Sequence, residues 1–169
     1  NKAGLDIPKI LKETSAGRKV HETGLGAHIP NEKLLELGVE VLAPAAVENV
    51  INKKNMRKIK AGIILEMANG PVTVEADGFL EKKGVVVLPD ILANSGGVVV
   101  SYLEWAQNLA NEHWSEKEVN GRLEKYMTDS LREIEAERAA EAGSYRRAAY
   151  VLAVRRILQA EEDRGNATR

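Results

Sequence analysis

Two asparagines, Asn69 and Asn94, each follow a short apolar run of the chain and stand next to or near glycine. A side-chain amide carries both donors and an acceptor, so it can bind a ribose hydroxyl or a carboxamide. The neighbouring Gly70 and Gly96 would let a ligand approach the backbone closely. Asn-Gly is also an ordinary turn signal, so these residues alone leave a ligand site and a simple turn both open.

A second candidate is a stripe with spacings of four, three and four residues: Asn94, Val98, Ser101 and Trp105. Such spacing places its members on one face of a helix. The positive N-terminal end of that helix would favour a carboxylate or a phosphate. Two glycines in its first turn cost about 1 kcal/mol each relative to alanine. They indicate that a ligand or a neighbouring strand lies close to the backbone, and the stripe therefore predicts a ligand-facing helix.

Three apolar runs without polar alternation are the elements that would position these residues: Val39–Ala43, Gly62–Leu65 and Val85–Leu88. This pattern is typical of parallel strands that are covered on both faces. Helix-like stretches accompany them at Asn31–Gly38, Glu48–Ile59 and Glu75–Lys83. The alternation predicts an α/β fold with right-handed crossovers. In an open parallel sheet, ligands bind beyond the carboxyl ends of the strands, where both asparagines fall.

The flanking segments are more helical. We expect a helix at Ile7–Glu13 and, over residues 17–30, a loop around a short strand. A helix capped by Asn94 or Ser95 should run to about residue 111. Ser115 and Glu118 have the spacing of a capping box and should open a long helix. Gly143 and Ser144 break the pattern before a last helix over residues 145–160.

Composition excludes several kinds of protein. The 169 residues carry 24 Lys and Arg against 25 Asp and Glu, a formal net charge of −1, and no cysteine. A basic excess for nucleic acid or an anionic membrane surface is missing, so neither is an expected partner. Without cysteine there are no disulfides, thiolate zinc sites or cysteine nucleophiles. The chain lacks an initiator Met, a signal peptide and an apolar stretch of about 20 residues, so we expect a soluble, cytoplasmic piece of a longer polypeptide.

Other motifs are weak. His21, His28 and His113 lie outside any metal-binding spacing, and no metal site is predicted. The pair Gly24 and Gly26 resembles half of a dinucleotide fingerprint but lacks the third glycine, so we interpret it as a glycine loop. The basic cluster of residues 53–60 is interpreted as a polar helix surface.

Longer motifs resemble a known family. These are Pro44–Asn49, Ala68–Pro71 and Pro89–Trp105, supported by Gly4–Pro8 and Ala148–Ala153. In order and spacing they resemble the carboxy-terminal part of glutamate dehydrogenases, within the glutamate/leucine/phenylalanine/valine dehydrogenase family. The Asn-x-Gly-Gly-Val core is shared across that family, whereas the Val-Ser-Tyr-x-Glu-Trp continuation points to the glutamate enzymes.

The resemblance implies the second half of a doubly wound, Rossmann-like parallel sheet, followed by a C-terminal bundle of helices. Residues 1–92 would be part of an NAD(P)-binding domain, and residues 93–169 would be helices that return to pack on it. The implied activity is the NAD- or NADP-dependent, reversible oxidative deamination of L-glutamate to 2-oxoglutarate and ammonia. A homo-oligomer is expected, because the full-length family forms hexamers.

The resemblance also assigns roles to individual residues. Ala46 would border the cofactor, and Asn69 and Asn94 would lie along its nicotinamide nucleoside. Val98 and Ser101 would line the glutamate pocket, where the serine hydroxyl helps to hold the side-chain carboxylate. The family's glycine-rich turn, its ribose-binding acidic residue and its catalytic lysine and aspartate match nothing here. No catalytic residue is therefore predicted in this chain, and we expect the isolated chain to be inactive.

Some positions depart from the family pattern. Met67 replaces a glycine and could crowd the backbone near the ribose, while Val72, Val74 and Ser95 replace threonine, proline and alanine. Two other functions stay open. The chain could be a stand-alone, non-catalytic paralogue that acts as a binding or oligomerisation module, or part of a related amino-acid dehydrogenase with another substrate. Ser101 argues against the last of these.

Overall fold

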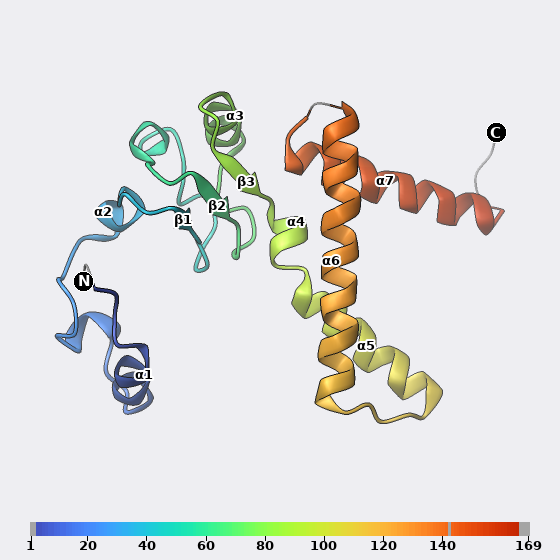
Figure 1. Cartoon of the computed structure of the whole chain (residues 1–169), viewed down its shortest axis with the longest axis horizontal. Coiled ribbons are helices and arrows are strands. Elements are labelled where there is room, and N and C mark those ends of the chain that lie inside the picture. The colour runs from blue at the N-terminus through green and yellow to red at the C-terminus, as the bar shows by residue number, and fades with distance from the viewer. Residues whose placement is uncertain (1–2, 142, 166–169) are drawn as a thin grey trace. The chain divides into compact units, whose positions relative to one another are not determined.

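The structure, a computed structural model, describes residues 3–141 and 143–165 and divides into two compact units, Asn1–Leu37 and Gly38–Arg169. The first unit contains helix α1 (Ile7–Ser15), the short 3-10 helix η1 (Val20–Glu22) and helix α2 (Asn31–Leu35) (Figure 1). The Asp6 side chain accepts a hydrogen bond from the Lys9 N–H at the start of α1. The predicted helix over residues 7–13 is thus confirmed.

The short strand predicted within residues 17–30 is wrong. This stretch forms η1, whose first turn is closed by the Lys19 N–H donating to Glu22 Oε2 at 2.8 Å. The Arg18 guanidinium donates to the Glu22 carbonyl oxygen. Because these local side-chain hydrogen bonds satisfy the backbone, they compete with strand pairing.

The second unit is built on a three-stranded parallel sheet in the order β1-β2-β3. The strands are β1 (Val41–Leu42), β2 (Ile63–Leu65) and β3 (Val86–Leu88), each inside a predicted apolar run. Helix α3 (Val74–Lys82) connects β2 to β3 and begins where the Thr73 hydroxyl accepts from the Ala76 N–H. The predicted α/β fold with a parallel sheet is confirmed.

The two faces of the sheet differ in burial. Ile64 and Val87, which pair across β2 and β3, are 0% and 8% exposed. The row on the other face, Val41, Ile63 and Val86, is 50%, 38% and 39% exposed. The expectation that the strands are covered on both faces is met only in part by the described residues: on the second face Leu65 and Leu88 are partly buried, whereas Val41, Ile63 and Val86 are exposed.

Residues 48–59, predicted as a helix, are mostly irregular. They contain an isolated bridge from Ile51 to Val72 and the 3-10 helix η2 (Met56–Lys58). The Asn52 N–H donates to Asn55 Oδ1 at 2.8 Å, and the Asn55 side chain donates to the Val50 carbonyl at 2.7 Å. Asparagine side chains offer the backbone such hydrogen bonds as an alternative to those of a helix. The helix predicted from the polar pattern of this segment is therefore wrong.

In the described part of the chain, four helices follow β3: α4 (Asp90–Ala93), α5 (Gly96–Ala110), α6 (Glu116–Glu141) and α7 (Tyr145–Asp163). The predicted capping box is present, since the Ser115 N–H and hydroxyl both donate to Glu118 Oε2 at 2.8 and 2.7 Å. Helix α6 packs against α5 and α7 (Figure 1). A buried cluster joins α4, α6 and α7: Leu92, Ile134, Ala148 and Ala149. The predicted bundle of helices after the sheet is confirmed. The division at residue 92 stays a prediction.

Candidate functional site

The loops at the carboxyl ends of β1 and β2 are hydrogen-bonded to each other. The Pro44 carbonyl accepts from the N–H groups of Met67 and Ala68 at 3.1 and 2.9 Å, and the Asn49 N–H donates to the Gly70 carbonyl at 2.8 Å. Ala46 lies exposed in the first of these loops. The backbone of the two loops is therefore held side by side at the edge where ligands of open parallel sheets bind.

The asparagines predicted to bind a ligand meet directly. Asn94 Nδ2 donates to Asn69 Oδ1 at 2.7 Å. Asn69 is exposed and Asn94 is partly buried at the end of α4. Among the described residues, no other side-chain hydrogen bond engages Asn69 Nδ2 or Asn94 Oδ1. The pair thus presents one amide donor group and one carbonyl acceptor to a ligand.

This amide pair belongs to a closed ring of hydrogen bonds. The Gly70 N–H donates to Asp90 Oδ2 at 2.8 Å. The Asn94 N–H donates to the Asp90 carbonyl at 3.1 Å, one turn later in α4. Asn69 and Gly70 are joined by the peptide bond, so the ring links the loop after β2 to the loop after β3. Asn94 is held at its own backbone as well as at its side chain, and Asn69 is held at its side chain and through the N–H of the following Gly70.

A buried carboxylate lies behind this ring. Glu66, the residue after β2, is 0% exposed. Its Oε2 accepts from the Asp90 N–H at 2.8 Å, and its Oε1 accepts from Arg146 Nη2 at 2.7 Å. A carboxylate removed from water needs such partners, because an unpaired buried charge is very costly.

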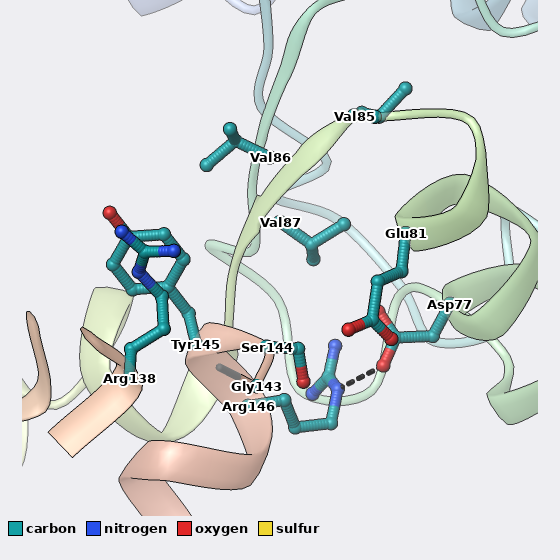
Figure 2. Close-up of a pocket in the computed structure, with 11 residues that line it drawn as sticks. Asp77, Glu81, Val85, Val86, Val87, Arg138, Gly143, Ser144, Tyr145 and Arg146 are labelled. Atoms are coloured by element: carbon teal, nitrogen blue, oxygen red, sulfur yellow. Dashed lines mark hydrogen bonds and ion pairs between the residues drawn. The ribbon is translucent and has the colours of Figure 1, made fainter. Parts of the chain in front are cut away.

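Arg146, in the first turn of α7, binds three carboxylates with three different nitrogens. Besides Glu66, it contacts Asp77 through Nε at 2.7 Å and Asp90 through Nη1 at 3.4 Å. Figure 2 shows the guanidinium reaching Asp77 of α3. Burial lowers the pKa of Arg146, but hydrogen bonds to Glu66 and Asp77 outweigh it and raise that pKa above its ordinary value. The residue is therefore a permanent cation in this network.

The pocket drawn in Figure 2 lies beside β3 and the start of α7. It is lined by Val86, Asp77, Tyr145 and Arg146, among others, and contains none of the five predicted site residues. The Arg138 guanidinium carbon lies 4.8 Å from the centre of the Tyr145 ring. This pocket is distinct from the edge of the sheet that carries Asn69 and Asn94.

The predicted stripe on α5 is open to solvent. Val98 is 73% exposed and Trp105 59% exposed, and Ser101 between them is exposed as well. The predicted stripe is wrong for Asn94, which ends α4 and is separated from α5 by Ser95, whereas Val98, Ser101 and Trp105 lie on α5 close to the amide pair. Apolar side chains that remain exposed at the edge of a polar site are typical of a surface that binds another group.

One glycine of this helix has no packing role in the described part of the chain. A side-chain Cβ at Gly97 would meet no atom within 4 Å, and one at Gly96 would meet only Leu123 at an ordinary 3.7 Å. A neighbouring strand is therefore excluded, within the described residues, as the reason for the glycines. Close approach of a ligand, the other interpretation, fits this open backbone.

Residues 3–141 and 143–165 contain no group of three or more histidine or acidic side chains that could hold a metal ion. The rings of His21 and His28 contact each other, with 5.8 Å between their centres. The helices of the described part of the chain include none that is long and apolar enough to span a bilayer.

The sequence did not reveal the network behind the site: Glu66, Asp77, Asp90 and Arg146. One signal was available, since Glu66 directly follows an apolar run and a carboxylate there needs a partner. Its cation lies 80 residues away in the sequence, and nothing in spacing identifies it.

The fold and this edge define a class: an open parallel α/β sheet with polar loops at the carboxyl ends of its strands. Residues 1–165 match the family model of glutamate/leucine/phenylalanine/valine dehydrogenase. The chain therefore belongs to this family of amino-acid dehydrogenases, which are oxidoreductases.

Individual relatives agree with that assignment. Glutamate dehydrogenase of Thermotoga maritima is 41% identical over 165 residues, which are 98% of this chain and 40% of that protein. The hetero-hexameric glutamate dehydrogenase of Thermus thermophilus, in a leucine-bound form, has a TM-score of 0.86 at 31% identity and covers 98% of this chain and 39% of its own. Glutamate dehydrogenase of Peptoniphilus asaccharolyticus has a TM-score of 0.81 at 33% identity, with 98% and 36% coverage.

The chain thus spans about two fifths of the length of these relatives. That coverage is consistent with the carboxy-terminal part expected from the motifs. The residues present in this chain suit only part of a dinucleotide cofactor. The free donor and acceptor of the Asn69–Asn94 pair and the open backbone at Gly97 fit a nucleoside. No glycine-rich turn that could hold a pyrophosphate is found in the sequence.

Proposed function

We propose that this chain supplies the nicotinamide side of the cofactor site and the substrate-carboxylate pocket of an NAD(P)-dependent glutamate dehydrogenase. The reaction is the reversible oxidative deamination of L-glutamate to 2-oxoglutarate and ammonia. One observation carries the proposal: the Asn69–Asn94 amide pair lies at the carboxyl edge of the sheet and adjoins the exposed stripe of α5. Family membership supports the reaction class.

In this proposal the dinucleotide lies along the loops after β1 and β2. Ala46 borders it, and its small side chain leaves room for the cofactor. Asn69 Nδ2 would donate to the nicotinamide nucleoside and Asn94 Oδ1 would accept from it. When bound, the nicotinamide would supply the hydride-accepting chemistry. Met67, at 43% exposure, stays outside the core and does not displace the backbone that Pro44 holds.

Substrate selection falls to α5. Val98 and Ser101 stand one turn apart on the exposed stripe. Val98 packs against the aliphatic part of glutamate, and the Ser101 hydroxyl donates to its side-chain carboxylate. A site that donates hydrogen bonds to a carboxylate rejects leucine or valine, because its polar group would lose its partner. This residue favours glutamate over the apolar substrates of the same family.

The acid–base groups are not among these residues. The family's catalytic lysine and aspartate have no counterpart in this chain, so its own residues bind and orient and do not transfer the proton. We therefore propose that the isolated chain is inactive and that activity requires the remaining three fifths of the enzyme, assembled as a homo-oligomer.

A chimera tests this function. Residues 1–165 replace the matching two fifths of the Thermotoga maritima enzyme, which is 41% identical over this stretch. NADH and NADPH are offered separately, with 2-oxoglutarate and ammonia. We expect turnover by the chimera with at least one cofactor and none by the isolated chain. Turnover of glutamate by the isolated chain would contradict the proposal, as would a folded, hexameric chimera without activity.

The stand-alone binding module is tested at the level of the gene. A reading frame that continues upstream of Asn1 into a glycine fingerprint and a lysine-bearing domain establishes the enzyme. A start codon at that point establishes the module instead.

A further inference from the structure

The ion network behind the site has a geometry that helix stability does not explain. Arg146 occupies the first turn of α7, where the positive end of the helix dipole disfavours a cation. Ser144 already caps this end by accepting from the Arg147 N–H at 3.2 Å. The position of Arg146 is therefore unfavourable for α7 and must be compensated by its three carboxylates.

Those carboxylates come from three separate segments. Glu66 follows β2, Asp77 belongs to α3, and Asp90 begins α4 after β3. The side chains of Arg146, Asp77 and Asp90 are 23%, 20% and 20% exposed, whereas Glu66 is fully buried. A planar guanidinium can address all three in fixed directions, which a single ammonium cannot do.

Two of the three contacts lead to the amide pair. Glu66 joins Arg146 to the Asp90 N–H, and Asp90 holds the Gly70 N–H, next to Asn69. The backbone carbonyl of the same residue, Asp90, accepts from the Asn94 N–H. Arg146 is thus the cation that completes the support of the hydrogen-bonded ring.

We propose that Arg146 is a positioning residue that sets the Asn69–Asn94 amide pair by tying the loop after β2 to the loop after β3. It acts through Glu66 and Asp90 and touches neither asparagine. The structural part of this proposal stands on the described contacts alone. Its consequence, correct placement of the nicotinamide nucleoside, rests on the function proposed above.

Arg146→Lys is the decisive variant, because it keeps the buried positive charge and loses the three-way geometry. The matched control is Arg155→Lys, on the same helix, where Arg155 binds Glu137 with two nitrogens at 2.8 and 3.0 Å. The ¹⁵N-labelled chain is measured by NMR, using the Asn94 side-chain amide shifts and the hydrogen exchange of the Gly70 amide. The Ile134 amide in α6 reports on the stability of the bundle.

We expect Arg146→Lys to move the Asn94 side-chain signals towards those of a free amide. It should also speed Gly70 exchange by about tenfold or more, with Ile134 unchanged, as local opening requires. Arg155→Lys should alter neither signal. Unchanged Asn94 and Gly70 signals in a folded Arg146→Lys chain would overturn the proposal.

If Arg146→Lys does not fold, Glu66→Gln decides in its place. It weakens the link from Arg146 through Glu66 to the Asp90 N–H but leaves the Asp90 acceptor of the Gly70 N–H in place, and Arg146 keeps Asp77 and Asp90 as counter-charges. Faster Gly70 exchange with altered Asn94 signals supports the proposal, and unaltered signals overturn it.

The cofactor consequence has a separate readout in the chimera. There, Arg146→Lys should raise the KM for the dinucleotide about tenfold, because the loss of one hydrogen bond weakens binding by about that factor. The KM for 2-oxoglutarate should change less. Altered NMR signals with an unchanged dinucleotide KM would leave positioning intact and overturn the cofactor role of the amide pair. The two failures are therefore distinguishable.

Discussion

Asn94 donates from Nδ2 to Asn69 Oδ1 at 2.7 Å, although the two residues are 25 positions apart in the sequence. Asn69 lies in the loop after β2 and Asn94 at the end of α4, which follows β3, so α3, β3 and α4 separate them along the chain. Their contact makes one polar unit out of two loops that alone would be ordinary turns. The proposed function requires this unit and the α5 stripe that begins beside it.

The buried charge network should dominate the stability of the second unit. Arg146→Met leaves Glu66 buried without a cation, which should lower the free energy of unfolding by about 3–5 kcal/mol. The control, Arg156→Met, breaks an ion pair with Glu133 in which both side chains are half exposed, and should cost less than about 1 kcal/mol. Urea denaturation followed by circular dichroism measures both.

A second comparison separates charge from packing. Adding Glu66→Gln to Arg146→Met neutralises the orphaned carboxylate, so part of the lost stability should return. Equal losses in Arg146→Met and Arg156→Met would mean that the network contributes no more than a surface ion pair.

We expect Gly97 to lower the stability of α5 and to leave its backbone accessible to a ligand. Gly97→Ala should raise the free energy of unfolding of the chain by about 0.5–1 kcal/mol, because nothing lies near the added Cβ. In the chimera the same change should impair binding of cofactor or substrate. Gly121→Ala is the matched control: Gly121 is also helical and equally unobstructed, so stability should rise without a kinetic effect. A Gly97→Ala chimera with parental kinetics would show that no ligand approaches this turn.

Ser101 should determine recognition of the substrate carboxylate. In the chimera, Ser101→Ala should lower kcat/KM for 2-oxoglutarate by about 10- to 100-fold, the loss expected for one hydrogen bond to a charged group. The KM for the dinucleotide should hardly change. Ser95→Ala serves as the control, because the Ser95 hydroxyl donates to the Leu92 carbonyl at 2.8 Å within the chain. Equal kinetic effects of the two substitutions would remove the special role of Ser101.

The capping box of α6 predicts a pH dependence. Hydrogen bonds from the Ser115 hydroxyl and N–H lower the pKa of Glu118 below its ordinary value. A carboxyl group with a lowered folded-state pKa contributes stability above its unfolded pKa, about 4.3, and this contribution is lost as the pH falls through the folded value. An NMR titration should show this depression, and Ser115→Ala should move the pKa of Glu118 back up. An unchanged pKa of Glu118 in the Ser115→Ala variant would show that Ser115 does not form this capping box.

The strands and their order could be predicted because their information is local. Each of β1, β2 and β3 lies in one unbroken apolar run, and short connections between parallel strands restrict the topology. The placement of Asn69 and Asn94 at the carboxyl edge followed from where ligands bind in open parallel sheets, whereas their direct hydrogen bond was not predicted. The helix predicted over residues 48–59 is wrong because the side chains of two asparagines, Asn52 and Asn55, hydrogen-bond to the backbone, and a hydrophobic pattern does not register this competition.

The support of the site was beyond sequence reasoning for a different reason. Glu66 and Arg146 are brought together only when α7 packs against the sheet, 80 residues later. Other arginines of α7, such as Arg147 and Arg155, have exposed side chains that each pair with a single glutamate. Residue type and spacing do not distinguish the buried arginine from these, whereas packing does.

A crystal structure of the active chimera with NAD(P) and 2-oxoglutarate bound would show whether Ser101 binds the substrate. The distance to measure runs from Ser101 Oγ to the side-chain carboxylate of the substrate. We predict a hydrogen bond of about 2.5–3.0 Å, with the nicotinamide nucleoside against Asn69 and Asn94. A substrate carboxylate bound elsewhere, with Ser101 still facing solvent, would contradict the account.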